Sequence, residues 1–255
     1  MKALFLLPLL AVAACATPPA RYGAYSSATQ AYLDGFQGEV RAVRMIRLPV
    51  VEEAAVPVVE PRRGRKGRAR RTAVAAAPVR ADCTVPSSLN SAAAERCRIL
   101  DRQTLTELTF RHASAMAAYF SAMAVVATRF DPAPGAAQMA EMRAEAMALG
   151  DDILRVAGID GGTLEPYRPV DAHVGLRPAF ATEMVTNGWQ IRRQWEIHDL
   201  ALAKLQSLPG GDTDQALRRL RAATASLREG FEALVRSDRE ALALIAGARQ
   251  ALDGG

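Results

Sequence analysis

The sequence predicts an all-α protein, an antiparallel bundle of four long helices, and two observations carry this prediction. Half of the 255 residues are hydrophobic and only 5% are aromatic, which suits an alanine-rich helical bundle better than a β-sandwich core. From about Ser91 onward, apolar residues recur every three or four positions, the spacing of one helix face. No longer period repeats along the chain, which argues against a solenoid.

Four segments carry such an apolar seam, over residues 105–130, 139–156, 184–205 and 217–248. The first helix is expected to run unbroken from Ser91 to Phe130, and the last from Thr213 to Gln250. The connections at 131–133 and 208–212 are short, so the helices that they join should be antiparallel. The connection at 158–177 is unusually long.

The run Ala113–Thr128 contains no charged residue and allows two interpretations. It is shorter than the roughly 20 residues that a bilayer requires, and its serines and alanines lower its hydrophobicity. We therefore expect a helix that is buried on most sides within the bundle rather than a membrane span.

The N-terminus resembles the precursor of a secreted protein. Lys2 gives a positive start, and the uncharged segment Ala3–Ala14 would reach only about 18 Å as a helix, short of a hydrocarbon core of about 30 Å. The residues Val12-Ala13-Ala14-Cys15 resemble the lipobox of bacterial lipoproteins. This resemblance implies a signal peptide over 1–14 and acylation of Cys15. Ordinary secretion is the alternative, since Ala11-Val12-Ala13 also fits a small-x-small cleavage site.

The same resemblance implies a cellular location. In the sorting rule of enteric bacteria, an aspartate after the cysteine retains a lipoprotein in the inner membrane. Here Ala16 follows the cysteine, so we expect the periplasmic face of the outer membrane. Several acyl chains would hold the protein more firmly than the marginal binding that one chain gives.

The other two cysteines, Cys83 and Cys97, form an even pair 14 positions apart. In an oxidising periplasm we expect them to form a disulfide, worth about 3 kcal/mol for a loop of this length. Metal binding by the pair is the rival interpretation, but no neighbouring histidine completes a site.

Residues 15–82 are predicted to be a tether, with one helix over 24–48, that presents the bundle domain of residues 83–255. The tether contains a basic run over 62–71 with seven positive charges and no negative one, namely Arg62, Arg63, Arg65, Lys66, Arg68, Arg70 and Arg71. Such a run suits contact with anionic lipid or lipopolysaccharide phosphates, or it is a solvated spacer. It contains no aromatic residue for base stacking, and without it and Lys2 the chain is slightly acidic. A nucleic-acid partner is therefore not expected.

Two of the three histidines, His112 and His198, fall on predicted apolar seams, as does Asp238. Inward-facing ligands of this kind could hold a metal or small ligand in a bundle. Buried, hydrogen-bonded histidines are the more ordinary explanation. No Glu-x-x-His pair or haem-attachment motif occurs, so we expect no metal and no cofactor.

The long connection offers a second candidate site, because recognition residues are common on loops above a rigid scaffold. Its polar side chains are Asp160, Glu165, Tyr167, Arg168, Asp171 and His173. An ordinary connection is the alternative. No motif identifies a nucleophile with its base or a phosphate-binding glycine loop, so an enzyme is not expected.

Together these patterns favour a lipid-anchored bacterial envelope protein with a non-catalytic structural or adaptor role, docked to another envelope protein. The alternative is a periplasmic lipoprotein that binds a ligand or metal inside its bundle.

Overall fold

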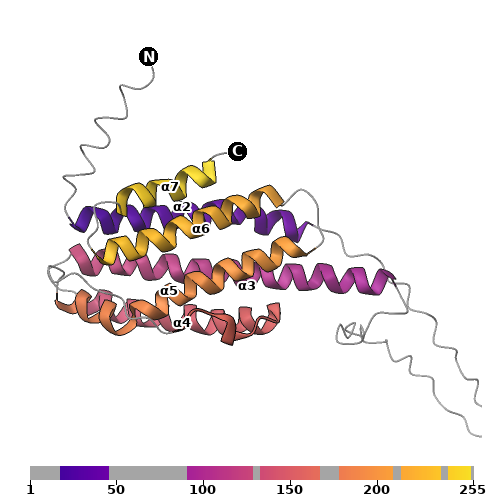
Figure 1. The fold of residues 1–255 in the computed structure, drawn as a ribbon, viewed down its shortest axis with the longest axis horizontal. Helices are drawn as coiled ribbons and strands as arrows, with labels where there is room; N and C mark the ends of the chain where they lie inside the picture. Colours follow the sequence, from indigo (N-terminus) through magenta and orange to yellow (C-terminus); the bar gives the residue numbers. More distant parts are fainter. Residues whose placement is uncertain are drawn as a thin grey trace, which may run out of the picture. The chain divides into compact units, whose positions relative to one another are not determined.

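The computed structural model describes residues 18–45, 91–128, 133–166, 178–208, 214–236 and 241–253. This part of the chain folds into six α-helices and one short 3₁₀ helix, with no strand (Figure 1). The α-helices are α2 (Pro18–Arg44), α3 (Ser91–Thr128), α4 (Ala133–Ala157), α5 (Pro178–Ser207), α6 (Asp214–Val235) and α7 (Ala241–Asp253), and the 3₁₀ helix is η1 (Gly161–Thr163). The predicted all-α bundle is confirmed.

The chain divides into two compact units. The first contains Met1–Met45 and Asp101–Gly255, and it holds the helical bundle. The second contains Ile46–Leu100, and its described residues are the first turns of α3. All contacts discussed below lie within the first unit.

The N-terminal helix is a full member of the bundle. It begins at Pro18, earlier than the predicted start at 24, and it ends at Arg44. Figure 1 shows α2 beside α6 and α7. The phenol of Tyr25 in α2 donates a hydrogen bond to the carbonyl of Leu227 in α6 over 2.7 Å. The first half of the predicted tether therefore supplies core residues, because its aromatic side chains at helical spacing need an apolar partner surface.

The single long helix expected over Thr213–Gln250 is wrong. α6 ends at Val235, and α7 begins at Ala241 and packs against α6. Gly230 in α6 faces α7, and a Cβ there would make ordinary van der Waals contact with the Ile245 side chain at 3.4 Å. A continuous helix would have placed Asp238 on the apolar seam, where an ionised carboxylate is costly without a partner. Asp238 itself lies between these two helices, outside the described residues.

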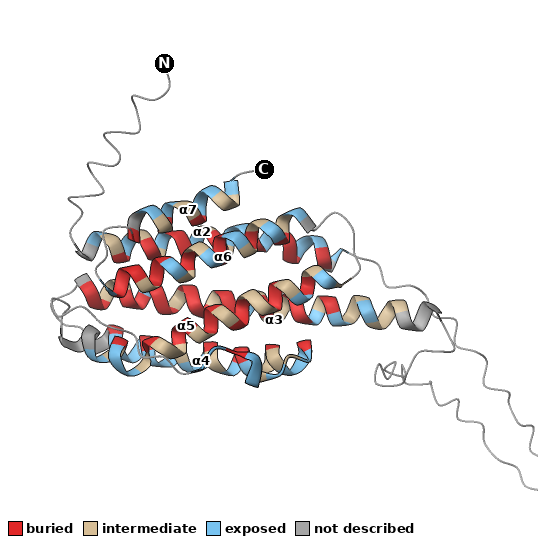
Figure 2. Cartoon of the chain, in the orientation of Figure 1, coloured by how far each residue is buried: buried red, intermediate tan, exposed pale blue. Residues whose placement is uncertain are grey.

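Aromatic side chains concentrate at the centre of the bundle. Buried residues follow the inner faces of α2, α3, α5 and α6 (Figure 2). Phe120 stacks on Trp195 with their ring centroids 5.9 Å apart, and Tyr25 meets the edge of Phe120 at 4.7 Å. Several of the aromatic residues that the structure describes thus meet in one place, where each buries a large apolar area.

The uncharged part of α3 is buried on several sides, as predicted: Ala113, Met116, Tyr119, Phe120 and Met123 are each less than 5% exposed. Among the helices that the structure describes, none is long and apolar enough to cross a bilayer.

Candidate functional site

The two seam histidines meet in the middle of the bundle. His112 of α3 and His198 of α5 are both fully buried, and their Nδ1 atoms lie 3.1 Å apart. His112 Nε2 lies 2.9 Å from Gln194 Oε1, and His198 Nε2 lies 2.6 Å from the Tyr32 hydroxyl. Every ring nitrogen of the pair therefore has a partner, as buried polar atoms require.

The neighbours of the pair fix the direction of each hydrogen bond. Gln194 Oε1 can only accept, so His112 Nε2 carries the hydrogen and neutral His112 accepts at Nδ1. His198 must then donate from Nδ1 and accept at Nε2 from the Tyr32 hydroxyl. The result is a single chain of hydrogen bonds across the core, which we call the histidine chain.

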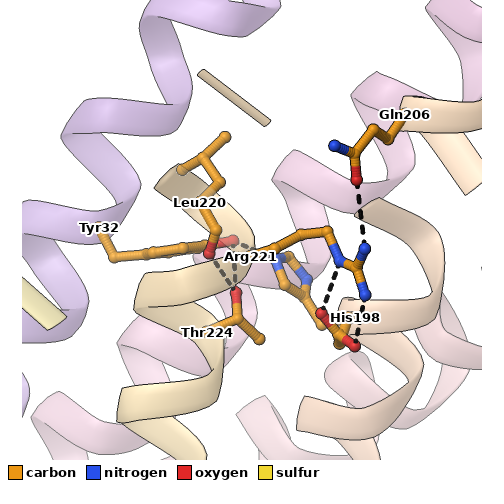
Figure 3. Close-up of polar contacts among 7 residues, drawn as sticks. Tyr32, His198, Gln206, Leu220, Arg221 and Thr224 are labelled. Carbon is orange, nitrogen blue, oxygen red and sulfur yellow. Dashed lines mark hydrogen bonds and ion pairs between the residues drawn. The ribbon is translucent and has the colours of Figure 1, made fainter. Parts of the chain in front are cut away.

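At its other end the histidine chain reaches α6. Thr224 Oγ1 lies 3.1 Å from the Tyr32 oxygen and 2.8 Å from the Leu220 carbonyl, so its one hydrogen can serve either acceptor. Figure 3 shows Tyr32, His198 and Thr224 approaching one another from their separate helices. Residues of α2, α3, α5 and α6 are thus joined by one network.

A fifth helix provides the space for Gln194. The backbone of Gly150 in α4 lies so close that a Cβ there would come within 2.3 Å of Gln194 Oε1. Gly150 has no side chain, and the Gln194 amide can therefore face His112. The absence of a side chain at Gly150 of α4 thus leaves room for the Gln194 amide in the histidine chain.

The surroundings keep both rings neutral. Burial lowers the pKa of His112 to about 4, although its bond to Gln194 partly opposes this. Burial also lowers the pKa of His198 well below its usual range, and the neighbouring charge of a protonated His112 would lower it further. Desolvation is the main cause in both rings because it penalises the charged form.

The geometry of the pair is that of a hydrogen bond rather than of two metal ligands. The rings are close to parallel, at 20°, and their centroids lie 5.4 Å apart, so the facing nitrogen atoms point directly at each other. A metal ion bound by both rings would need the lone pairs of both facing nitrogens, whereas here His198 Nδ1 carries the hydrogen of the bond to His112. Within the described residues, no three His, Cys, Asp or Glu side chains are grouped as a metal site requires.

A buried ion pair lies elsewhere in the bundle, between α2 and α3. Arg102 Nη2 lies 3.8 Å from Glu39 Oε1, and both side chains are 3% exposed. Arg102 also donates to the Leu208 carbonyl just after α5, over 3.3 Å. Burial raises the pKa of the Glu39 carboxyl, while the Arg102 charge lowers it.

Two further ion pairs join neighbouring helices nearer the surface. Glu183 of α5 accepts from Arg143 of α4, from Asn187 and from Tyr119 of α3. Arg221 of α6 donates to both carboxylate oxygens of Asp199, over 3.0 and 3.3 Å, and to Gln206 (Figure 3). These contacts hold neighbouring helices together.

The surface between α2 and α3 is hollowed into an open groove of about 580 Å³. Its lining is small and mostly uncharged: Gly23, Ser26, Ser27, Gln30, Ala117, Ser121, Ala124 and Val125. This groove is separate from the histidine chain, whose side chains do not line it.

The long connection is described only in its first part. Asp160 Oδ1 accepts from the Gly162 amide and caps η1, and the Glu165 amide donates to the Glu196 carboxylate over 2.8 Å. Both residues thus have local structural roles. Tyr167, Arg168, Asp171 and His173 lie outside the described residues.

Several other predicted positions also lie outside the described residues: Cys15, the basic run over 62–71, Cys83 and Asp238. Cys97 lies in α3, and its disulfide with Cys83 stays a prediction. The structure brings together His112 and His198 from the predicted cluster. Sequence reasoning missed Tyr32, Gln194 and Thr224 as their partners, although Tyr32 falls on the apolar face of the N-terminal helix.

The chain was compared with known proteins. No protein-family model matches it, and no curated protein or solved structure matches it either. Functional interpretation therefore depends on the residues of this chain.

Proposed function

We propose that this protein is a lipid-anchored component of a bacterial envelope, with a non-catalytic structural or adaptor bundle that docks another envelope protein. The observation that carries the non-catalytic part is the histidine chain. Among the described residues, His112 and His198 are the side chains best suited to acid–base catalysis. Both are fully buried, and all four of their ring nitrogens are hydrogen-bonded to partners inside the protein. They stabilise the fold and are not presented to a substrate.

The anchor part is supported by the lipobox Val12-Ala13-Ala14-Cys15 together with the position of α2, which begins three residues after Cys15. A helix that close to the cysteine, and built into the core, would transmit the anchorage directly to the bundle. The periplasmic face of the outer membrane is the proposed location, because Ala16 follows the cysteine. Anionic lipid or lipopolysaccharide is the proposed contact of the basic run.

The alternative of a ligand or metal held within the bundle is less favoured. The two imidazoles are already bonded to each other at 3.1 Å, and a shared ion would need the lone pairs of both facing nitrogens, whereas His198 Nδ1 carries the hydrogen of that bond. A bound ligand would likewise have to break bonds that the core has already satisfied.

Photocrosslinking in intact cells tests the adaptor role. A photoreactive amino acid is placed at Ser121 or Ser27, which line the groove between α2 and α3, and at Ala137, an exposed matched position on α4. We expect one envelope protein to be captured from the groove positions and not from Ala137. Membrane-bound protein that gives no discrete product at any position would contradict the adaptor role.

Acylation is tested separately by mass spectrometry of the native protein. We expect a chain that begins at an acylated Cys15. An intact leader, or a free thiol at Cys15, would contradict the lipid anchor and leave the histidine-chain argument untouched.

A further inference from the structure

The distance between the anchor and the bundle is fixed by the start of α2. Only Ala16 and Thr17 separate Cys15 from Pro18, the first residue of α2. A fully extended chain covers at most about 3.3–3.6 Å per residue, so this connection spans about 10 Å.

The buried side chains of α2 prevent its N-terminal turns from unwinding to lengthen that connection. Tyr22 and Tyr25, in its second turn, are 3% and 0% exposed, and Tyr25 is bonded to the Leu227 carbonyl. Unwinding the first turns of α2 would pull these rings out of the core. The end of the bundle at which α2 begins must therefore stay close to an acylated Cys15.

Contacts identify the other helix ends at that same end of the bundle. A Cβ at Gly230 of α6 would lie within 4 Å of both Tyr25 of α2 and Ile245 in the first half of α7. A Cβ at Gly35, further along α2, would lie 3.4 Å from Leu252 at the end of α7. α7 therefore runs parallel to α2 and begins near its start. Gly135 of α4 packs against Val126, which lies at the end of α3 beside the start of α2. Glu183 near the start of α5 bonds to Tyr119 in the same part of α3.

The N-termini of α2, α4, α5 and α7 thus gather at one end of the bundle. A helix N-terminus carries a partial positive charge and favours anions. None of these four helices has an acidic residue in its first turn. Asp131 and Glu240 precede α4 and α7 in the sequence and lie outside the described residues.

Two arginines lie at this end of the bundle. Arg21 lies in the first turn of α2. Arg236 follows α6, whose Gly230 lies beside Tyr25, and its side chain is 52% exposed. Glu232 lies 3.9 Å from it and offsets part of that charge.

We propose that this end of the bundle stands directly on the bilayer surface, with the start of α2 facing phosphate-bearing lipid head groups. The inference rests on the proposed acylation of Cys15. Its main support is the short connection between Cys15 and α2. The partial positive charges of the helix N-termini at this end would also be attracted to an anionic surface. α2 has 27 residues, so its far end would lie about 40 Å from the head groups.

Energy transfer from the full-length acylated protein in vesicles tests this orientation. A donor dye is attached through an azide-bearing amino acid at Gly23, which has open space around it, or at Met45, which is 81% exposed at the other end of α2. The acceptor dye is on the lipid head groups. We expect transfer from Gly23 to exceed transfer from Met45 several-fold. Equal transfer from the two sites would overturn the proposal.

A matched insertion shows that the short connection is the cause. Thirty Gly/Ser residues placed between Ala16 and Thr17 leave Cys15 and the bundle unchanged. We expect this variant to stay acylated and bound while transfer from Gly23 falls to the level of Met45. Transfer from Gly23 that survives the insertion in zwitterionic vesicles would contradict the role of the short connection.

The electrostatic attraction of this end of the bundle to anionic lipid is tested separately. We expect the ratio of transfer from the two sites to be larger in vesicles with anionic phospholipid than in zwitterionic ones, and the difference to shrink in high salt. A ratio independent of lipid charge would overturn this attraction. Loss of acylation or of vesicle binding in the unmodified protein would instead contradict the lipid anchor itself.

Discussion

The Tyr32 hydroxyl and His198 Nε2 lie 2.6 Å apart, although the two residues are 166 positions apart in the chain. Both side chains are buried, and the contact joins α2 to α5 at the centre of the bundle. Because each partner would be left unsatisfied in the core without the other, the N-terminal helix is held in one register by a polar contact as well as by apolar packing.

Substitution of this pair should reveal strong coupling. His198→Phe leaves His112 Nδ1 without a partner and leaves Thr224 Oγ1 as the remaining acceptor near the Tyr32 hydroxyl. We expect it to lower the free energy of unfolding by about 2–4 kcal/mol. Tyr32→Phe leaves His198 Nε2 unsatisfied and should cost about 1–3 kcal/mol. In the double variant the two costs should not add, since the orphaned partners disappear together. Urea denaturation of the four proteins measures this, and additive losses would contradict the contact.

Stability should fall as the solution becomes acidic. Unfolded histidine has a pKa of about 6.5, whereas the pKa of folded His112 is about 4 and burial also holds the pKa of folded His198 well below its usual range. Between these values the unfolded chain binds protons that the folded chain does not. We expect full stability above about pH 7 and a loss below pH 6.5 of up to about 1.4 kcal/mol per pH unit for each histidine.

A variant without the titrating rings provides the control for this pH dependence. His112→Phe, His198→Phe and Tyr32→Phe together remove both imidazoles and the hydroxyl that they would orphan. Glu39 remains, and its raised carboxyl pKa makes folding more favourable as the pH falls, the opposite sense. Urea midpoints measured at pH 7 and pH 5 should drop in the natural protein and much less in the triple variant. Equal drops would assign the acid sensitivity to other groups.

The helical pattern and the place of the histidines followed from the sequence because both depend on local spacing. His112 and His198 interrupt apolar seams, and a buried polar residue needs a partner from another helix. Their contact with each other could be suspected from that spacing alone. Gln194 was missed because helices contain many polar residues, and only packing decides which of them face the core. Thr224 lies on the predicted seam of the last helix, but helical spacing does not say which side chain it contacts.

The place of the N-terminal helix and the break after Val235 were misjudged for a different reason. The helix over 24–48 was predicted as part of the tether, whereas seven apolar residues of α2 are buried against other helices. After Val235 the seam spacing continued through Asp238 into Ala241 and Ile245. Spacing alone does not distinguish a continuous helix from two that pack against each other.

Gly150→Ala should destabilise the protein although alanine is the better helix former. The new Cβ would lie 2.3 Å from Gln194 Oε1, so the Gln194 amide must move and lose its bond to His112. We expect a loss of about 1–3 kcal/mol from the orphaned His112 nitrogen, larger than the gain of at most about 1 kcal/mol in helix propensity. Thermal or urea denaturation measures the difference.

Gly38→Ala is the matched control, because nothing lies within 4 Å of a Cβ at this position in α2. It should stabilise the protein by about 0.5–1 kcal/mol. A stabilising effect at both glycines would show that Gln194 can move without cost, and would contradict the role assigned to Gly150.

Replacement of Arg102 should be far more harmful than replacement of an exposed arginine. Arg102→Met leaves the Glu39 carboxyl buried without its counter-charge, which costs about 3–5 kcal/mol for a buried ion pair. Arg155 pairs with Asp152 on the surface of α4, where its side chain is 75% exposed, so Arg155→Met should cost less than about 1 kcal/mol. Adding Glu39→Met to Arg102→Met should restore much of the loss, since the unpaired charge is removed. Chemical denaturation of these variants measures each step, and a double variant no more stable than Arg102→Met would show that Arg102 acts mainly through the Leu208 carbonyl.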